Sequence, residues 1–194
     1  SKYITKTILS SEDDEILQTG KNYGAEVIKR PYELALDEAK TAPVMLHVLE
    51  ELEKEGYSAD YVVLLQPTCP LRDENYIDSA FEYYFEKQKE GFDSCFGAYS
   101  FGYTHAKWKI LHNNKLEALY DFRLRPRRQE EEQHHKMICE NGAFYALKWD
   151  TLKEVKDFIG YNPAAYITQR IIDIDTVDDF KKVEEILIKR NENA

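Results

Sequence analysis

The feature that most constrains the fold is an apolar run at residues 61–65, followed at once by a turn that contains Pro67 and Pro70. A short β-rich run without polar residues is typical of a parallel strand that is buried on both faces. Short apolar runs and amphipathic segments alternate along the chain on both sides of it. This alternation predicts an α/β fold, with a mostly parallel sheet and helices on both faces.

The sequence divides into elements that fit this scheme. Strands are expected at residues 4–9, 25–29, 61–65, 93–99, 141–147 and 166–172. Helices are expected at residues 15–23 and 41–55, across Ile77 to Phe85, and after Thr176. Gly24 ends the first helix, and Thr41 and Thr176 are suited to the N-cap positions of two others.

Length and composition limit the class of protein. The 194 residues are 43% hydrophobic and 32% charged, as expected for one globular domain over residues 1–194. No apolar run approaches the ~20 residues of a membrane span, and the first residues do not form a secretory signal. The cysteines are widely spaced and predict neither a zinc site nor a disulfide framework. We therefore expect a cytoplasmic protein that binds no membrane.

The net charge of -10 argues against nucleic acid as a partner. Positive charge is concentrated only within residues 100–137, an excursion from the sheet with weak periodicity. Its arginines are Arg123, Arg125, Arg127 and Arg128. They either bind an anion or form a solvated stripe neutralised by the glutamates at 130–132. The excursion is also too aromatic for a free loop, which predicts a lid or, in a homodimer, an oligomerisation arm.

Three shorter motifs fall where strands are predicted to end. The turn at residues 66–72, here called the Gln66 turn, follows the apolar strand, where ligands bind in open α/β sheets. Its polar groups could instead cap the next helix. Asp173 and Asp175 are spaced to approach one hard cation, although one of them could instead cap the last helix. Asn141 and Gly142 form a weaker motif, which the start of a strand explains equally well.

Taken in order, these motifs resemble the acylneuraminate cytidylyltransferases, also called CMP-sialic acid synthetases. The matching residues are Gln66-Pro67-Thr68-Cys69-Pro70-Leu71-Arg72, Arg128-Gln129, Asn141-Gly142-Ala143-Phe144-Tyr145 and Asp173-Ile174-Asp175-Thr176, together with Ser10-Ser11-Glu12-Asp13 and Arg30-Pro31-Tyr32-Glu33-Leu34-Ala35. The resemblance spans almost the whole chain. It implies a Rossmann-like nucleotidyltransferase, usually a homodimer, that converts CTP and an acidic nine-carbon sugar into a CMP-sugar and pyrophosphate.

The resemblance also implies roles for individual residues. Asp173 and Asp175 would bind Mg²⁺ (or Mn²⁺) and, with Gln66, form the catalytic group. The nucleotide-binding residues would be Arg30, Pro31, Ala35, Thr68 and Arg72. The sugar-binding residues would be Gln66, Arg128, Gln129, Asn141, Tyr145 and Phe158. In-line attack on a phosphorus atom needs orienting and neutralising groups and no covalent nucleophile, which agrees with these roles.

The sequence departs from the family pattern in three places. Cys69 stands where the family usually has serine, and Ser11-Glu12 stands where it has threonine and aspartate. The family's first strand and its triphosphate loop have no counterpart in the sequence, so we expect residues to precede Ser1. Two alternatives are a related enzyme that uses 3-deoxy-octulosonate and a catalytically inactive module that binds a nucleotide sugar.

Overall fold

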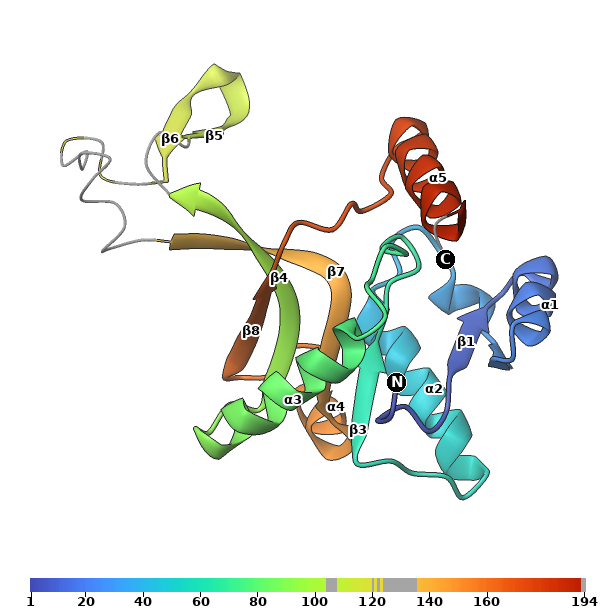
Figure 1. Ribbon diagram of the computed structural model, residues 1–194. Helices are drawn as coiled ribbons and strands as arrows, with labels where there is room; N and C mark the ends of the chain where they lie inside the picture. The colour runs from blue at the N-terminus through green and yellow to red at the C-terminus, as the bar shows by residue number, and fades with distance from the viewer. Residues whose placement is uncertain (104–107, 120, 122, 124–135, 193–194) are drawn as a thin grey trace.

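The computed structural model of the protein describes residues 1–103, 108–119, 121, 123 and 136–192 (Figure 1). Its strands are β1 (Ile8–Ser11), β2 (Glu26–Lys29), β3 (Tyr61–Leu64), β4 (Ser94–Tyr103), β5 (Trp108–Ile110), β6 (Leu116–Ala118), β7 (Lys136–Lys148) and β8 (Pro163–Thr168). Its helices are α1 (Asp14–Asn22), α2 (Thr41–Lys54), α3 (Tyr76–Lys89), α4 (Trp149–Val155) and α5 (Val177–Glu192), with short 3-10 helices η1 (Tyr32–Leu34) and η2 (His112–Asn114).

The central sheet has four strands in the order β3-β7-β4-β8. β7 runs antiparallel to β3 and to β4, whereas β4 and β8 are parallel. β3, β4 and β8 therefore all point in one direction, and β7 alone in this sheet runs against them. β1 and β2 form a separate parallel pair, and the predicted α/β class is confirmed.

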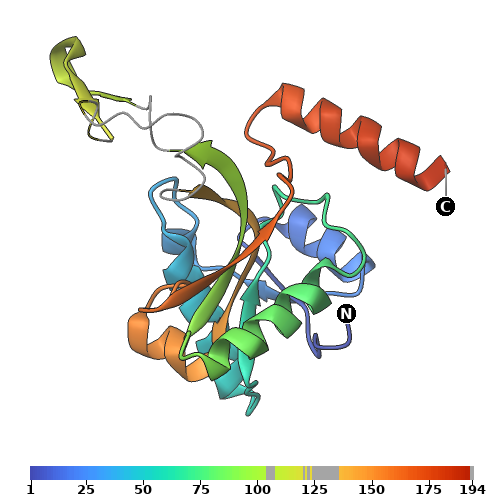
Figure 2. The same ribbon diagram turned by 60° about the vertical axis from the view of Figure 1, so that its left-hand side comes forward.

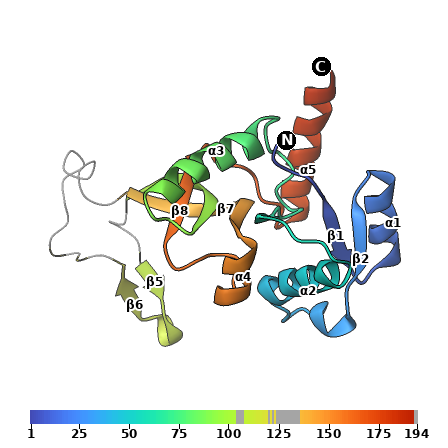
Figure 3. The same ribbon diagram turned by 90° about the horizontal axis from the view of Figure 1, so that it is seen from below.

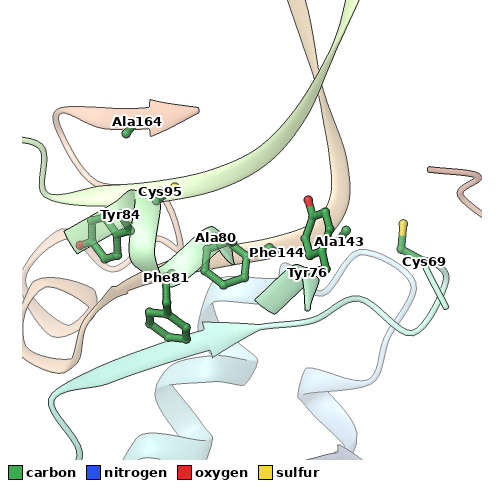
Figure 4. Packing of buried hydrophobic residues seen from close by; sticks show 10 residues of the cluster. Cys69, Tyr76, Ala80, Phe81, Tyr84, Cys95, Ala143, Phe144 and Ala164 are labelled. Carbon is green, nitrogen blue, oxygen red and sulfur yellow. The ribbon is translucent and has the colours of Figure 1, made fainter. Parts of the chain in front are cut away.

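Helices cover both faces of the four-stranded sheet (Figure 3). On one face, α3 buries Phe81 against Phe144 of β7 and Tyr84 near Cys95 of β4 (Figure 4). On the other face, α2 and α4 bury Leu49 and Leu152 against the sheet. Apolar burial of this kind contributes roughly 1.5–3 kcal/mol for each large side chain, so these two layers hold the sheet in place.

α2 also packs against the two-stranded sheet. Ile8 of β1 and Ile28 of β2 contact the same cluster as Val62 and Leu64 of β3. Among the described residues, β1 pairs only with β2 and β3 only with β7. One edge of β1 and one edge of β3 thus lack a strand partner within the described chain. The expectation that a further strand precedes Ser1 stays a prediction.

Several predicted bounds were wrong. β1 begins at Ile8 rather than at residue 4, because Tyr3 and Ile4 instead pack against the aromatic cluster around α3. β8 ends at Thr168 rather than at residue 172, since its pairing with β4 runs only as far as Tyr99. β4 and β7 are longer than predicted because they pair as far as Tyr103 and Lys136. The short helix α4 was not predicted, and burial of its Trp149 and Leu152 accounts for it.

Part of the excursion is described. β5 and β6 form an antiparallel hairpin that projects beyond the end of β4 (Figure 2). Ile110 and Leu116 face each other across it and are 74% and 61% exposed. Arg128 and Gln129 lie outside the described residues. No helix in the described part of the chain is long and apolar enough to cross a membrane.

Candidate active site

The Gln66 turn follows β3 and is tied to β7 by hydrogen bonds. The backbone N–H of Gln66 donates to the carbonyl of Gly142 at 3.3 Å. Arg72 donates from Nε to the carbonyl of Ala143 and from Nη2 to that of Gln66, each at 2.7 Å. Burial lowers the pKa of Arg72, as expected for a guanidinium removed from water. Nε and one N–H of Nη2 thus hold the turn, which leaves Nη1 and the second N–H of Nη2 for the predicted contact with the nucleotide.

Cys69 lies fully buried inside the turn. Its Sγ donates to the carbonyl of Asn141 at 2.8 Å. Burial, and after it the nearby carboxylate of Asp173, raises the pKa of Cys69 to about 12. The thiol is therefore neutral and faces protein backbone. A buried thiol at this position has no surface that a ligand could contact.

Asp173 and Asp175 lie in an extended segment between β8 and α5, further beyond the strand than predicted, because β8 ends at Thr168. The N–H of Ile174 donates to the carbonyl of Thr68 at 2.9 Å, which fastens this segment to the Gln66 turn. Thr176 caps α5 through reciprocal bonds: Thr176 Oγ1 accepts from the N–H of Asp179 at 3.2 Å, and the N–H of Thr176 donates to Asp179 Oδ2 at 3.1 Å. The helix cap therefore needs neither Asp173 nor Asp175.

The Asp173 carboxylate fits a hard divalent cation. Its Oδ1 is shielded from solvent and has no hydrogen-bond partner among the described residues. Such an oxygen is costly to bury unless a donor or a cation satisfies it. In the described part of the chain no three His, Cys, Asp or Glu side chains converge on one point. A cation here would take one or two carboxylates and fill its shell with water and phosphate oxygens, which is the usual arrangement for Mg²⁺.

Asn141 and Gly142 shape β7 where it passes the turn. The amide of Asn141 is buried; its Nδ2 donates to Tyr76 Oη at 3.1 Å and its Oδ1 accepts from the N–H of Ala143 at 3.0 Å. Gly142 has φ +68°, and a Cβ there would lie 2.9 Å from Cys69 Sγ and still closer to the amide oxygen of Gln66. Glycine is thus required so that the Gln66 side chain can lie over β7.

Two aromatic rings line the neighbouring surface. The rings of Tyr145 and Phe158 meet edge to face, with centroids 4.8 Å apart. Tyr145 is 4% exposed, and its Oη donates to Glu140 Oε2 at 2.9 Å. Burial raises the pKa of Tyr145, and the charges of Glu140 and Asp173 add to the shift. The phenol therefore stays protonated. It lies close enough to Asp173 for the charge of that carboxylate to raise its pKa.

Hydrogen bonds to Asp93 and Ser94 fix the loop that carries Phe158. Its carboxylate accepts from the N–H groups of Tyr161 at 2.8 Å and Asn162 at 3.0 Å. Ser94 Oγ accepts from the N–H of Gly160 at 2.8 Å and donates to Asp93 at 3.1 Å. A Cβ at Gly160 would lie 2.6 Å from Asp93 Cγ, so the loop approaches as closely as glycine allows. We call this arrangement the Asp93 clamp.

The predicted base-side residues lie at the two-stranded sheet. Arg30 follows β2, and its Nη2 and Nε donate to the carbonyl and Oγ of Ser10, at 2.5 and 3.3 Å. Pro31 precedes η1 and Ala35 ends it, with the N–H of Ala35 bonded to Tyr32. These residues border the end of β1, whereas Gln66, Thr68, Asp173 and Tyr145 gather at the end of β3.

Sequence reasoning missed Glu140 and Asp93. Glu140 directly precedes the Asn141-Gly142 motif, so its position was a usable signal. Nothing in the sequence marks Asp93, because its partners are about seventy residues away.

The fold is shared with known nucleotidyltransferases. A structure of CMP:2-keto-3-deoxy-manno-octonic acid synthetase complexed with CTP superposes with a TM-score of 0.63 at 14% identity, covering 96% of this chain and 82% of that one. 4-Diphosphocytidyl-2C-methyl-D-erythritol synthase from Anaerococcus prevotii gives a TM-score of 0.57 at 11% identity, covering 96% and 83%. This chain therefore has a Rossmann-like nucleotidyltransferase fold.

Sequence comparison gives the family. A family model described as cytidylyltransferase matches residues 1–186, so the chain belongs to the cytidylyltransferase family and is a nucleotidyltransferase. It is 28% identical to pseudaminic acid cytidylyltransferase from Campylobacter jejuni, over 97% of this chain and 80% of that protein. It is 25% identical to N-acylneuraminate cytidylyltransferase from Oncorhynchus mykiss, over 97% and 42%. The corresponding protein of Escherichia coli is 26% identical, over 98% and 44%.

Proposed function

We propose that this protein transfers CMP from CTP to a nonulosonic acid, an acidic nine-carbon sugar of the sialic or pseudaminic type, and releases pyrophosphate. The observation that carries the proposal is the position of Asp173. A carboxylate with a buried, unpartnered oxygen is fastened through Ile174 to the Gln66 turn, at the end of β3 where such sheets bind ligands. The names of the relatives above support a nine-carbon acid rather than an eight-carbon acid as the sugar substrate.

The reaction joins the anomeric oxygen of the sugar to the α-phosphorus of CTP. The bond from that phosphorus to the oxygen bridging to the β-phosphate breaks, pyrophosphate leaves, and the hydroxyl proton passes to water. A Mg²⁺ or Mn²⁺ ion on Asp173 and Asp175 would supply positive charge for the triphosphate and for the leaving group. Nucleotidyl transfer of this kind requires orientation and charge stabilisation and no covalent enzyme intermediate.

Different residues of the site would bind the sugar and the nucleotide. Gln66, lying over Gly142, presents an amide that can donate to and accept from sugar hydroxyls. The half-buried ring of Phe158, which packs against Tyr145, offers an apolar wall for the sugar. Arg128 and Gln129 of the excursion would approach the sugar carboxylate, and Arg30, Pro31 and Ala35 the cytosine. We place the reaction in the cytoplasm, where CTP is available.

The experiment uses the full natural protein with CTP, MgCl₂ and one acid at a time. The acids are N-acetylneuraminic acid, pseudaminic acid and 3-deoxy-octulosonic acid. Pyrophosphate release and the mass of the CMP-sugar are measured. We expect turnover with a nine-carbon acid. Turnover with the eight-carbon acid alone, or with none of the three, would contradict the proposal.

A further inference from the structure

Glu140 is an exposed carboxylate on β7 whose position is fixed by a buried neighbour. It pairs with Ala98 of β4, next to the register shift between Phe96 and Ala98. Its Oε2 accepts from Tyr145 Oη at 2.9 Å, although the two residues are five apart on one strand. Among the described residues nothing else bonds to the Glu140 carboxylate. One oxygen is therefore anchored and the other is available to a ligand.

The surroundings of Glu140 connect it to the candidate active site. Its anchor, Tyr145, packs against Phe158 and lies within range of the charge of Asp173. Two residues further along β7, Gly142 lies under the Gln66 side chain. The exposed carboxylate thus borders the surface formed by Gln66 and the aromatic pair.

We propose that Glu140 is a specificity-determining residue, which accepts a hydrogen bond from an N–H or O–H group at the end of the sugar remote from the sugar's own carboxylate. This inference rests on the proposed function. The reason is electrostatic. Two carboxylates close together repel each other, so an acidic sugar binds beside Glu140 only with its anionic end turned away. The end that meets Glu140 must then present donors, because a carboxylate only accepts.

The class of group at this end of the sugar follows from the same chemistry. An acylamino N–H or a ring or side-chain hydroxyl satisfies Glu140, whereas a carbonyl, an ether or a second carboxylate leaves it unpaired. A site built to accept from a substrate donor rejects the analogue that lacks the donor much more strongly than an apolar pocket rejects a missing methylene. Glu140 would therefore select among nonulosonic acids by the donors they carry.

The test compares Glu140→Gln with the wild type and with Glu154→Gln. Glutamine keeps the length of the side chain and one acceptor oxygen and removes the charge. Glu154 is an exposed glutamate on α4 and serves as the matched control. KM is measured separately for CTP and for the acid that the wild type uses best. We expect the sugar KM of Glu140→Gln to rise about 10- to 100-fold, the loss typical of a charged hydrogen bond, with the CTP KM within about twofold.

A second variant separates recognition from folding. Tyr145→Phe keeps the ring contact with Phe158 and releases the anchor of Glu140. If Glu140 acts on the sugar through its fixed position, the double variant Glu140→Gln/Tyr145→Phe should be no worse than the poorer single variant. An unchanged sugar KM in Glu140→Gln, or an equal rise for CTP, would overturn this inference while leaving the proposed function intact. Failure of the wild type to use any of the acids would overturn both.

Discussion

The backbone N–H of Ile174 donates to the carbonyl of Thr68 at 2.9 Å. This bond joins two segments more than one hundred residues apart in the sequence, and it sets the Asp173 and Asp175 carboxylates beside the Gln66 turn. Because Thr176 and Asp179 already cap α5, neither carboxylate is needed to begin that helix. The pair is therefore not committed to the helix cap.

The first prediction concerns these carboxylates. Asp175→Asn should nearly abolish turnover and barely change the melting temperature, because Asp175 is exposed and is not the helix cap. Asp173→Asn should also abolish turnover and leave stability equal or higher, since it removes charge from Oδ1, which is shielded from solvent and lacks a hydrogen-bond partner. Activity and thermal unfolding are measured on the same samples. Near-normal activity in Asp175→Asn would contradict its role with the cation.

Asp179→Asn is the matched control for this pair. Asp179 bonds to Thr176, and that contact lowers the pKa of its carboxyl. Its replacement should cost about 0.5–2 kcal/mol of stability, as for the loss of a cap, and should leave turnover largely intact.

The second prediction concerns Arg128, whose proposed partner is the sugar carboxylate. Arg128→Ala should raise the sugar KM by about one to two decades, which corresponds to the roughly 1.5–3 kcal/mol of a charge-assisted contact. The CTP KM should change little. Arg123→Ala removes an equal charge from the same excursion and is the control. A rise confined to CTP would reassign Arg128 to phosphate.

The third prediction concerns the Asp93 clamp. Asp93→Asn turns an amide N–H toward backbone donors that a carboxylate oxygen now satisfies. We expect a loss of about 1–3 kcal/mol in the free energy of unfolding. We also expect a rise in the sugar KM without a rise in the CTP KM, because the clamp positions Phe158. Asp60→Asn, an exposed change elsewhere, is the control. Equal changes in the sugar KM and the CTP KM would show that the Asp93 clamp has only a structural role.

The fourth prediction concerns alkaline pH. Burial raises the pKa of both Cys69 and Cys95 to about 12, from about 8.5 in an exposed thiol. The folded state therefore holds protons that the unfolded state releases, so the stabilisation is complete below about pH 8.5 and is lost as the pH rises toward 12. Denaturant unfolding at several pH values should show this decline, to which the buried tyrosines add with the same sign.

Two thiol experiments check that prediction. Cys95→Ala should flatten the decline, and the exposed change Cys139→Ser should not. In the folded protein at pH 8, iodoacetamide should modify Cys139 and leave Cys69 and Cys95 unmodified. Rapid modification of Cys69 would contradict its burial in the Gln66 turn.

The sequence predicted much of the fold because its signals are local. The apolar strand at 61–65, the Thr176 cap and the Gln66 turn each rest on neighbouring residues, and each forms at the predicted place. The surroundings of the strand were predicted wrongly: β3 is only partly buried, and it pairs antiparallel with β7 rather than as a parallel strand buried on both faces. Contacts between distant residues could not be predicted in this way. The anchor from Tyr145 to Glu140 depends on the irregular course of β7 and β4, and the Asp93 clamp depends on a close approach at Gly160. The end of β8 at Thr168 likewise depends on its pairing with β4, which is distant in the sequence.

The last prediction concerns assembly. Ile110 and Leu116 form a cross-strand pair on the projecting β5–β6 hairpin, and both are largely exposed. An apolar pair on a projection is better explained by burial against another chain than by exposure to water. We propose a homodimer that buries this hairpin, with the closed two-fold symmetry usual for identical chains. In such a dimer we further propose that Arg128 would reach the active site of the second chain.

Light scattering at micromolar concentration should give about twice the chain mass of 22.8 kDa. Ile110→Lys/Leu116→Lys should give the monomer and lower activity, because two buried charges without partners would oppose association. Ile167→Lys is the control: Ile167 is 55% exposed on the edge strand β8, and a lysine there should leave the mass unchanged. A wild-type protein that is fully active as a monomer would rule out the dimer, and a dimer that survives the paired lysines would place its interface elsewhere.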